Sequence, residues 1–126
     1  EMCDSDWSSD VCSSDLCLKI KTNHRVSGQN DLMDRVAEVV CSVLSKPREV
    51  MMVVLEDEAG ISFAGTRRTA AYMELKGINL DDSLTGALSA ELCSLVAENL
   101  DIPQDRIYIV FESVDRKMWG VNGTTF

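Results

Sequence analysis

The stretches KPREVMMVVLE (residues 46–56) and IPQDRIYIVFE (residues 102–112) decide the fold, because they match as two copies of one pattern with the same spacing from proline to glutamate. In each copy the proline ends the segment before it. The apolar run over residues 50–55 is too short for a stable helix and too continuous for a solvated strand. We therefore expect it to be a central strand buried on both sides.

Helical periodicity precedes each copy. Apolar residues recur at three- and four-residue spacing over about residues 30–45, which predicts a helix with one face for a sheet. A second stripe, mostly of leucines, runs over residues 84–100, and Asp81 or Asp82 can cap the start of that helix.

Strand signals stand before both helices. CLKIKTN (residues 17–23) alternates apolar residues with lysines, and a weaker strand is expected around residues 71–78. The prediction is an α/β fold in which two β-α-β units, each with a right-handed crossover, form a four-stranded mixed sheet with both helices on one face. The other face needs a cover. Symmetric self-association is the expected one, and the C-terminal tail, where Asn122-Gly123 signals a turn, is the alternative.

Composition excludes several classes of function. A net charge of −9 over 126 residues opposes binding to nucleic acid, and the pair Arg67-Arg68 fits a solvated loop. No stretch approaches the roughly 20 apolar residues of a membrane-spanning helix, and no signal peptide is evident. Five cysteines without C-x-x-C spacing and a single histidine make a structural zinc site improbable. The pattern indicates a reducing compartment, so we expect a cytoplasmic protein without a metal site, with release by a non-classical route as an alternative.

Residues 1–16 differ in composition from the rest of the chain. The segment reads EMCDSDWSSDVCSSDL and holds five Ser and four Asp, with too few apolar residues for a core, so it is expected to be a disordered extension. The stretch from Asp6 to Leu16, DWSSDVCSSDL, is similar to the translation of a sequencing-library adapter, so the segment is either an artefact or a genuine acidic tail. The folded domain is expected over residues 17–126.

A family resemblance emerges from several short motifs in order. They are CLKIKTN, the pair Lys46-Pro47, FAGT (residues 63–66), AAYMEL (residues 70–75), PQDRIYI (residues 103–109) and the ending NGTTF. Together they resemble macrophage migration inhibitory factor, D-dopachrome tautomerase and their relatives, and AAYMEL favours the plant-like or microbial branch. The resemblance implies a homotrimer whose active sites lie at subunit boundaries, without a cofactor.

The resemblance also implies a reaction and a set of site residues. The family catalyses keto-enol tautomerisation of phenylpyruvate-type acids and isomerisation of dopachrome, with an N-terminal proline as base. Lys46 falls on the lysine that binds the substrate carboxylate. Ile78 falls on an isoleucine whose backbone amide contacts ligands, and Tyr108 on a tyrosine that enters from a neighbouring subunit. By themselves, Lys46 also fits a helix-end cation and Tyr108 a core tyrosine.

The sequence departs from the family at the pocket rim and at the base. The rim order is Trp119, Gly120, Val121, the reverse of the animal members, and Val110 replaces an asparagine. Leu16 stands where the proline is expected, and an internal amide nitrogen is not basic because its lone pair is delocalised.

Two functions follow from these observations. One is a tautomerase acting on a small aromatic keto acid, active in a chain that begins with a free proline. The other is a cytokine-like trimer that binds a protein receptor or partner, or a family member without activity. The chain as written is expected to be inactive.

Overall fold

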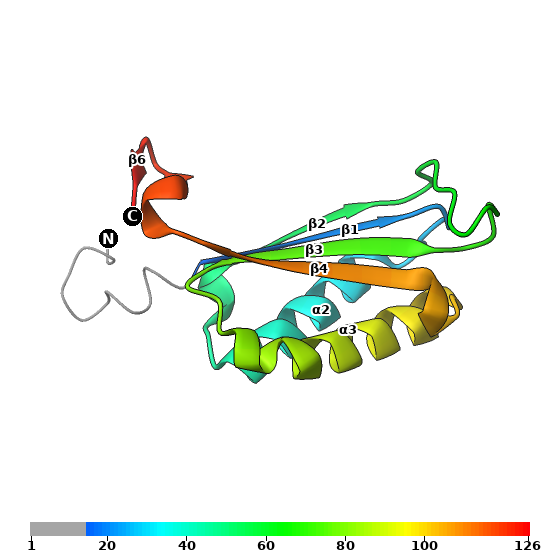
Figure 1. The fold of residues 1–126 in the computed structure, drawn as a ribbon, viewed down its shortest axis with the longest axis horizontal. Coiled ribbons are helices and arrows are strands. Elements are labelled where there is room, and N and C mark those ends of the chain that lie inside the picture. The colour runs from blue at the N-terminus through cyan, green and yellow to red at the C-terminus, as the bar shows by residue number, and fades with distance from the viewer. Residues whose placement is uncertain (1–14) are drawn as a thin grey trace.

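The computed structural model describes residues 15–126, and within them a sheet and two long helices form two layers (Figure 1). The main strands are β1 (Leu16–Thr22), β2 (Met51–Glu56), β3 (Ala71–Ile78) and β4 (Ile107–Val114). The long helices are α2 (Gln29–Leu44) and α3 (Thr85–Leu100). The shorter elements are the 3₁₀ turns η3 (Arg48–Val50), η4 (Asp82–Leu84), η5 (Gln104–Arg106) and η6 (Arg116–Met118), and the strands β5 (Gly120–Val121) and β6 (Thr124–Thr125).

The sheet joins two β-α-β units through their first strands. Its order is β2-β1-β3-β4; β1 is parallel to β2, β3 is parallel to β4, and β1 pairs antiparallel with β3. Both helices cover one face (Figure 1). The predicted four-stranded mixed sheet with two helices on one face is therefore confirmed.

The core lies between the sheet and the two helices. It is built from alternate residues of β1 and β3 and from the apolar stripes of the helices, which the three- and four-residue spacing brings onto one face. The fully buried members are Leu18, Ile20, Met73, Leu75, Val36, Val40, Leu88, Leu92 and Val96. Val26, Ile102 and Ile107, which lie outside the helices, also belong to the core.

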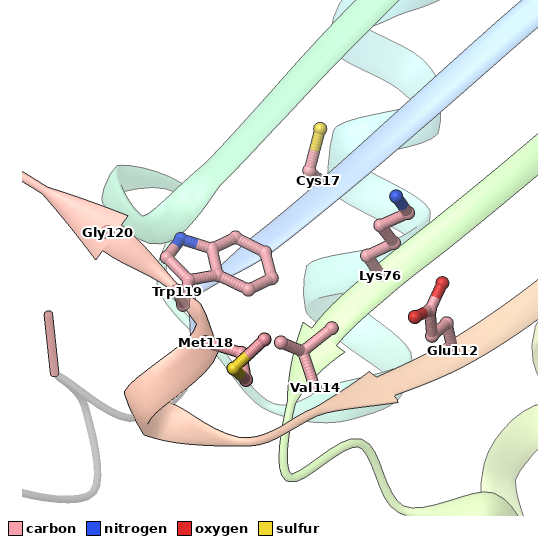
Figure 2. A pocket seen from close by; sticks show the side chains of 7 residues that line it. All are labelled: Cys17, Lys76, Glu112, Val114, Met118, Trp119 and Gly120. Carbon is pink, nitrogen blue, oxygen red and sulfur yellow. The ribbon is translucent and has the colours of Figure 1, made fainter.

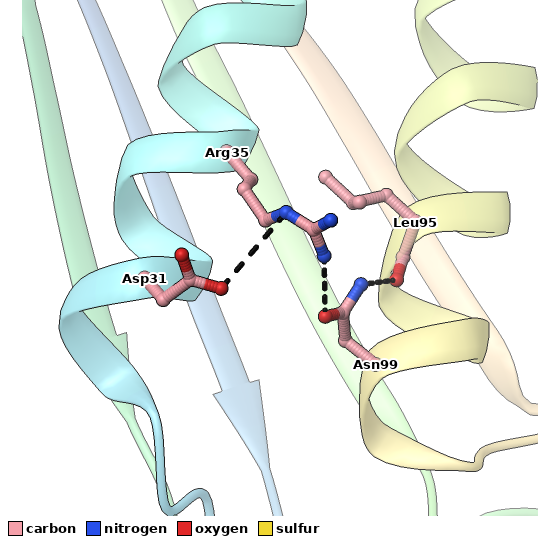
Figure 3. Close-up of polar contacts among 4 residues, drawn as sticks. All are labelled: Asp31, Arg35, Leu95 and Asn99. Carbon is pink, nitrogen blue, oxygen red and sulfur yellow. Dashed lines mark hydrogen bonds and ion pairs between the residues drawn. The ribbon is translucent and has the colours of Figure 1, made fainter.

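Polar contacts join the two helices at their solvent side (Figure 3). Arg35 of α2 donates from Nη1 to Oδ1 of Asn99 on α3 at 2.8 Å, and its Nε lies 3.9 Å from Oδ2 of Asp31. Asn99 donates in turn to the carbonyl of Leu95 at 2.7 Å. These contacts are exposed, so they orient the helices and add little stability compared with the core.

Both helices end in the same way, which shows that the sequence repeat is structural. The last helical turn closes on Ser45 in the first unit and on Asp101 in the second, each in the left-handed conformation with φ of 57° and 55°. The next amide then donates to the carbonyl five residues back, from Lys46 and from Ile102. Positions 46 and 102 are thus equivalent in the two units.

The prediction that residues 50–55 form a central strand buried on both sides is wrong. β2 is an edge strand, and so is its counterpart β4. On the face away from the helices these edge strands expose Met52 (62%), Val54 (39%), Tyr108 (61%) and Val110 (48%). Each crossover places the second strand of its unit on the outside, because the first strands of the two units pair with each other. The continuous apolar pattern of β2 therefore reflects an exposed apolar face and not a central position.

The C-terminal tail forms the turn that its sequence predicts but leaves most of the open sheet face uncovered. β5 and β6 pair as a hairpin whose turn residues Asn122 and Gly123 have φ of 56° and 81°, as a tight hairpin turn requires. The hairpin lies beyond the end of the sheet (Figure 1).

Candidate functional site

A cavity of about 420 Å³ opens on the uncovered face of the sheet, at the end where β1 begins and β4 finishes. The described residues that line it are Cys17, Lys76, Glu112, Val114, Met118, Trp119 and Gly120 (Figure 2). Its floor is polar and its rim is apolar. A ligand with a charged part and an apolar part suits such a lining.

The floor of the cavity is a row of three side chains from neighbouring strands. Cys17 of β1 is in register with Lys76 of β3, and Lys76 is in register with Glu112 of β4. Side chains alternate along a strand, and these three fall on the face opposite the buried Leu18 and Leu75. The sequence analysis did not identify this row, because only the strand register brings the three side chains together.

Trp119 forms the rim and is held by the chain on both sides of it. Its amide donates to the carbonyl of Arg116 across the η6 turn, and its carbonyl accepts from the amide of Phe126 after the hairpin. The indole lies over the start of β1 near Cys17 (Figure 2). Of the two rim residues named from the sequence, Trp119 thus lines the cavity, whereas Val121 lies in β5 and is 45% exposed.

Lys46 lies at the same end of the molecule as the cavity, directly after α2. Its equivalent in the second unit, Ile102, is buried at 2% exposure and belongs to the core. Lys46 is half-buried. A lysine therefore occupies a position where the fold accepts an apolar residue.

The residue at the position of the expected base, Leu16, is preceded by other residues and is paired with neighbouring strands in this chain. Leu16, which the sequence analysis assigned to the extension, is the first residue of β1 and is 3% exposed. The hydrogen bonding between β1 and β3 extends one residue further back, because the amide of Ile78 donates to the carbonyl of Asp15 at 3.1 Å. The amide that the resemblance assigns to ligand binding is thus already used, and the Ile78 side chain is buried. Burial raises the pKa of the Asp15 carboxyl.

Tyr108 lies at the opposite end of the sheet from the cavity. Leu16 pairs with Gly77 and Gly77 with Ser113, so Tyr108 stands five residues along β4 from the cavity end. At about 3.3 Å per residue the separation is roughly 17 Å. One chain cannot place Tyr108 at its own cavity, so any role there requires a second chain.

A buried arginine that the sequence analysis did not identify holds the loop beside Tyr108. Arg106 is 6% exposed and donates to the carbonyls of Phe63, Arg68 and Thr69 at 3.2, 3.0 and 2.8 Å. Its guanidinium also lies 5.0 Å from the centre of the Phe63 ring, which in turn packs on Tyr108 at 4.7 Å. The repeat contained the signal, because the first unit has Val50 at the equivalent position.

Among residues 15–126, no group of three or more His, Cys, Asp or Glu side chains is arranged to hold a metal ion. Over the same residues, neither helix has the length and apolar character to cross a membrane.

The two tandem β-α-β units, with their pocket at the end of the open sheet face, define the chain as an α/β protein of the tautomerase superfamily. Residues 17–126 match the family described as Macrophage migration inhibitory factor (MIF), and the chain belongs to that family.

Individual relatives agree with this assignment. A macrophage migration inhibitory factor homolog of Trichinella spiralis is 32% identical over 98 residues, which are 77% of this chain and 86% of the relative. The crystal structure of a homologue from Prochlorococcus marinus has a TM-score of 0.83 at 34% identity and covers 87% of this chain and 98% of its own. The structure of the Trichinella spiralis protein has a TM-score of 0.77 at 29% identity, with 87% and 99% covered.

Proposed function

We propose that the native protein is a cofactor-independent keto-enol tautomerase acting on phenylpyruvate- or dopachrome-like substrates, and that its working form is a homotrimer. The observation that carries the proposal is the cavity beside position 16, with Lys46 at the same end of the sheet in place of a core residue. Membership of the tautomerase superfamily supports the reaction class. The exposed apolar residues of both edge strands support self-association.

The reaction needs one base and one cationic anchor. A free secondary amine at position 16 would remove a proton from the carbon next to the keto group, and the proton would then pass to the carbonyl oxygen to give the enol. Such an amine is available in its neutral form near pH 8, because an α-amino group titrates at roughly 7.7 to 8.0 and a neighbouring ammonium disfavours its protonated form. Lys46 would bind the carboxylate while Trp119 packs on the ring. Tyr108 would come from the neighbouring chain.

The extension blocks this reaction in two ways. Residue 16 becomes an amide, and the carbonyl of Asp15 occupies the amide of Ile78. A variant that begins at residue 16 and carries Leu16→Pro removes both obstacles.

The test compares that variant with the full chain on phenylpyruvate, following enol formation by absorbance. The shortened variant should be active and the full chain inert. A shortened variant with Lys46→Ala should bind phenylpyruvate more weakly, since the carboxylate loses its cation. Equal rates for the full chain and the shortened variant would refute the proposed base.

A second function, a trimer that binds a protein partner, is favoured by the internal Leu16, because a chain without a free base has no use for the catalytic pocket. The full chain should then retain a defined partner when Lys46 is changed to Ala. Loss of that partner with Lys46→Ala would place the binding in the pocket and contradict this second function.

A further inference from the structure

Two opposite charges on the floor of the cavity have no role in the proposed tautomerase reaction. Lys76 and Glu112 are exposed, stand in register on the neighbouring strands β3 and β4, and both line the cavity beside Trp119 (Figure 2). Adjacent strands lie about 4.8 Å apart, so a lysine and a glutamate in register can reach each other. Within residues 15–126, however, neither charged group makes an ion pair or a hydrogen bond.

In the first unit, away from the cavity, a lysine and a glutamate at the equivalent positions form an ion pair. Lys21 and Glu56 are in register on β1 and β2, at the positions equivalent to Lys76 and Glu112. There the Nζ of Lys21 lies 3.7 Å from Oε1 of Glu56, as an ordinary ion pair. The second unit keeps the same two charges apart around the cavity, so both remain available to a ligand.

The chemistry of the lining specifies the ligand. An ammonium from the protein attracts a carboxylate, and a carboxylate from the protein attracts an ammonium, so the open pair complements a zwitterion. The indole of Trp119 with Met118 and Val114 forms an apolar rim that suits an aromatic or large apolar group. A ligand with only one charge would leave the other protein charge facing an apolar group, which is unfavourable.

We propose that this cavity binds a free aromatic α-amino acid, with the ligand carboxylate on Lys76, its ammonium on Glu112 and its ring against Trp119. The site lies beside the proposed reaction centre and shares Trp119 with it. A bound amino acid would therefore compete with an aromatic keto acid. The binding itself needs no base at position 16 and is independent of the tautomerase reaction.

The test is calorimetric titration of the full chain with three probes at physiological salt. L-phenylalanine carries both charges, 3-phenylpropanoate lacks the ammonium, and 2-phenylethylamine lacks the carboxylate. L-phenylalanine should bind about tenfold more tightly than either of the other two, since each lacks one charge-assisted hydrogen bond.

Two variants and two matched controls assign the charges. Glu112→Gln should weaken the binding of L-phenylalanine about tenfold without weakening that of 3-phenylpropanoate, and Lys76→Gln should weaken the binding of L-phenylalanine similarly without weakening that of 2-phenylethylamine. Glu56→Gln and Lys21→Gln change the same residue types at the equivalent positions away from the cavity and should have no effect. All four side chains are at the surface, so the fold is retained, and circular dichroism would verify it.

Several outcomes would overturn the proposal. They are no binding of L-phenylalanine to the full chain, equal affinity for the three probes, or equal effects of the cavity variants and their controls. Failure of the tautomerase assay alone would leave these results unaffected, so the two proposals can fail separately.

Discussion

Replacing Arg106 with methionine tests how the loop beside Tyr108 is held. The guanidinium makes three hydrogen bonds to backbone carbonyls and lies over the Phe63 ring at 6% exposure. Hydrogen bonds to a charged group contribute about 1.5–3 kcal/mol each. The net loss is smaller than the sum of these hydrogen bonds for two reasons. Burying the guanidinium already costs free energy that methionine does not cost, and the loop carbonyls regain hydrogen bonds to water when the loop opens. We expect a net loss of roughly 3 kcal/mol in the free energy of unfolding.

Thermal and urea unfolding at one protein concentration would measure this loss, since self-association makes the melting temperature concentration-dependent. A loss of roughly 3 kcal/mol corresponds to a decrease of about 10 °C for a domain of this size. Arg48→Met is the matched control, because Arg48 is exposed and makes only a surface ion pair with Asp34 at 3.5 Å. It should cost less than about 1 kcal/mol. An Arg106→Met variant as stable as Arg48→Met would refute the reasoning.

Three further predictions concern other parts of the molecule. Asp81 accepts hydrogen bonds from the amide and hydroxyl of Ser83, which lower its pKa, so Asp81→Ala should reduce the melting temperature at pH 7. The difference in melting temperature between the two proteins should shrink as the pH falls below 3.8. The ionised Asp81 carboxylate stabilises the fold above its ordinary pKa of 3.8, and this stabilisation is lost as the pH falls through the lowered pKa of the folded protein. Met52→Glu should preserve the fold but weaken self-association, seen by sedimentation as a smaller species; an unchanged species would contradict the role of the open face. Iodoacetamide should modify Cys17 before Cys41, because Cys17 lines the cavity while burial hides Cys41 and raises its pKa; peptide mass mapping showing the reverse order would contradict this.

Local patterns predicted the elements because their causes are local. The stripe over residues 84–100 and the alternation in CLKIKTN depend only on which side chains share a face, and both elements are confirmed. Asp81 caps the η4 turn that leads into α3 rather than α3 itself, a difference of one turn. The position of β2 could not be inferred in this way, because an apolar face exposed at the edge of a single chain has the same sequence pattern as a buried central strand.

The site was only partly accessible from the sequence. Trp119 and Lys46 were identified through the family resemblance, whereas Lys76 and Glu112 are brought together by the strand register, which periodicity does not contain. The internal repeat would have helped further. Comparing its copies shows Lys46 against Ile102 and Arg106 against Val50, and a charged residue where the other copy has an apolar one marks a position whose role differs between the two units.

The length of β4 between Tyr108 and the cavity has a genetic consequence. If the proposed homotrimer places Tyr108 of one chain at the cavity of another, two defective chains, one altered at Lys46 and the other at Tyr108, would form one intact site when they assemble together, since each supplies the residue that the other lacks. Neither defect alone would be rescued by adding more of the same chain. Complementation between such alleles would therefore reveal shared sites without any structure of the assembly.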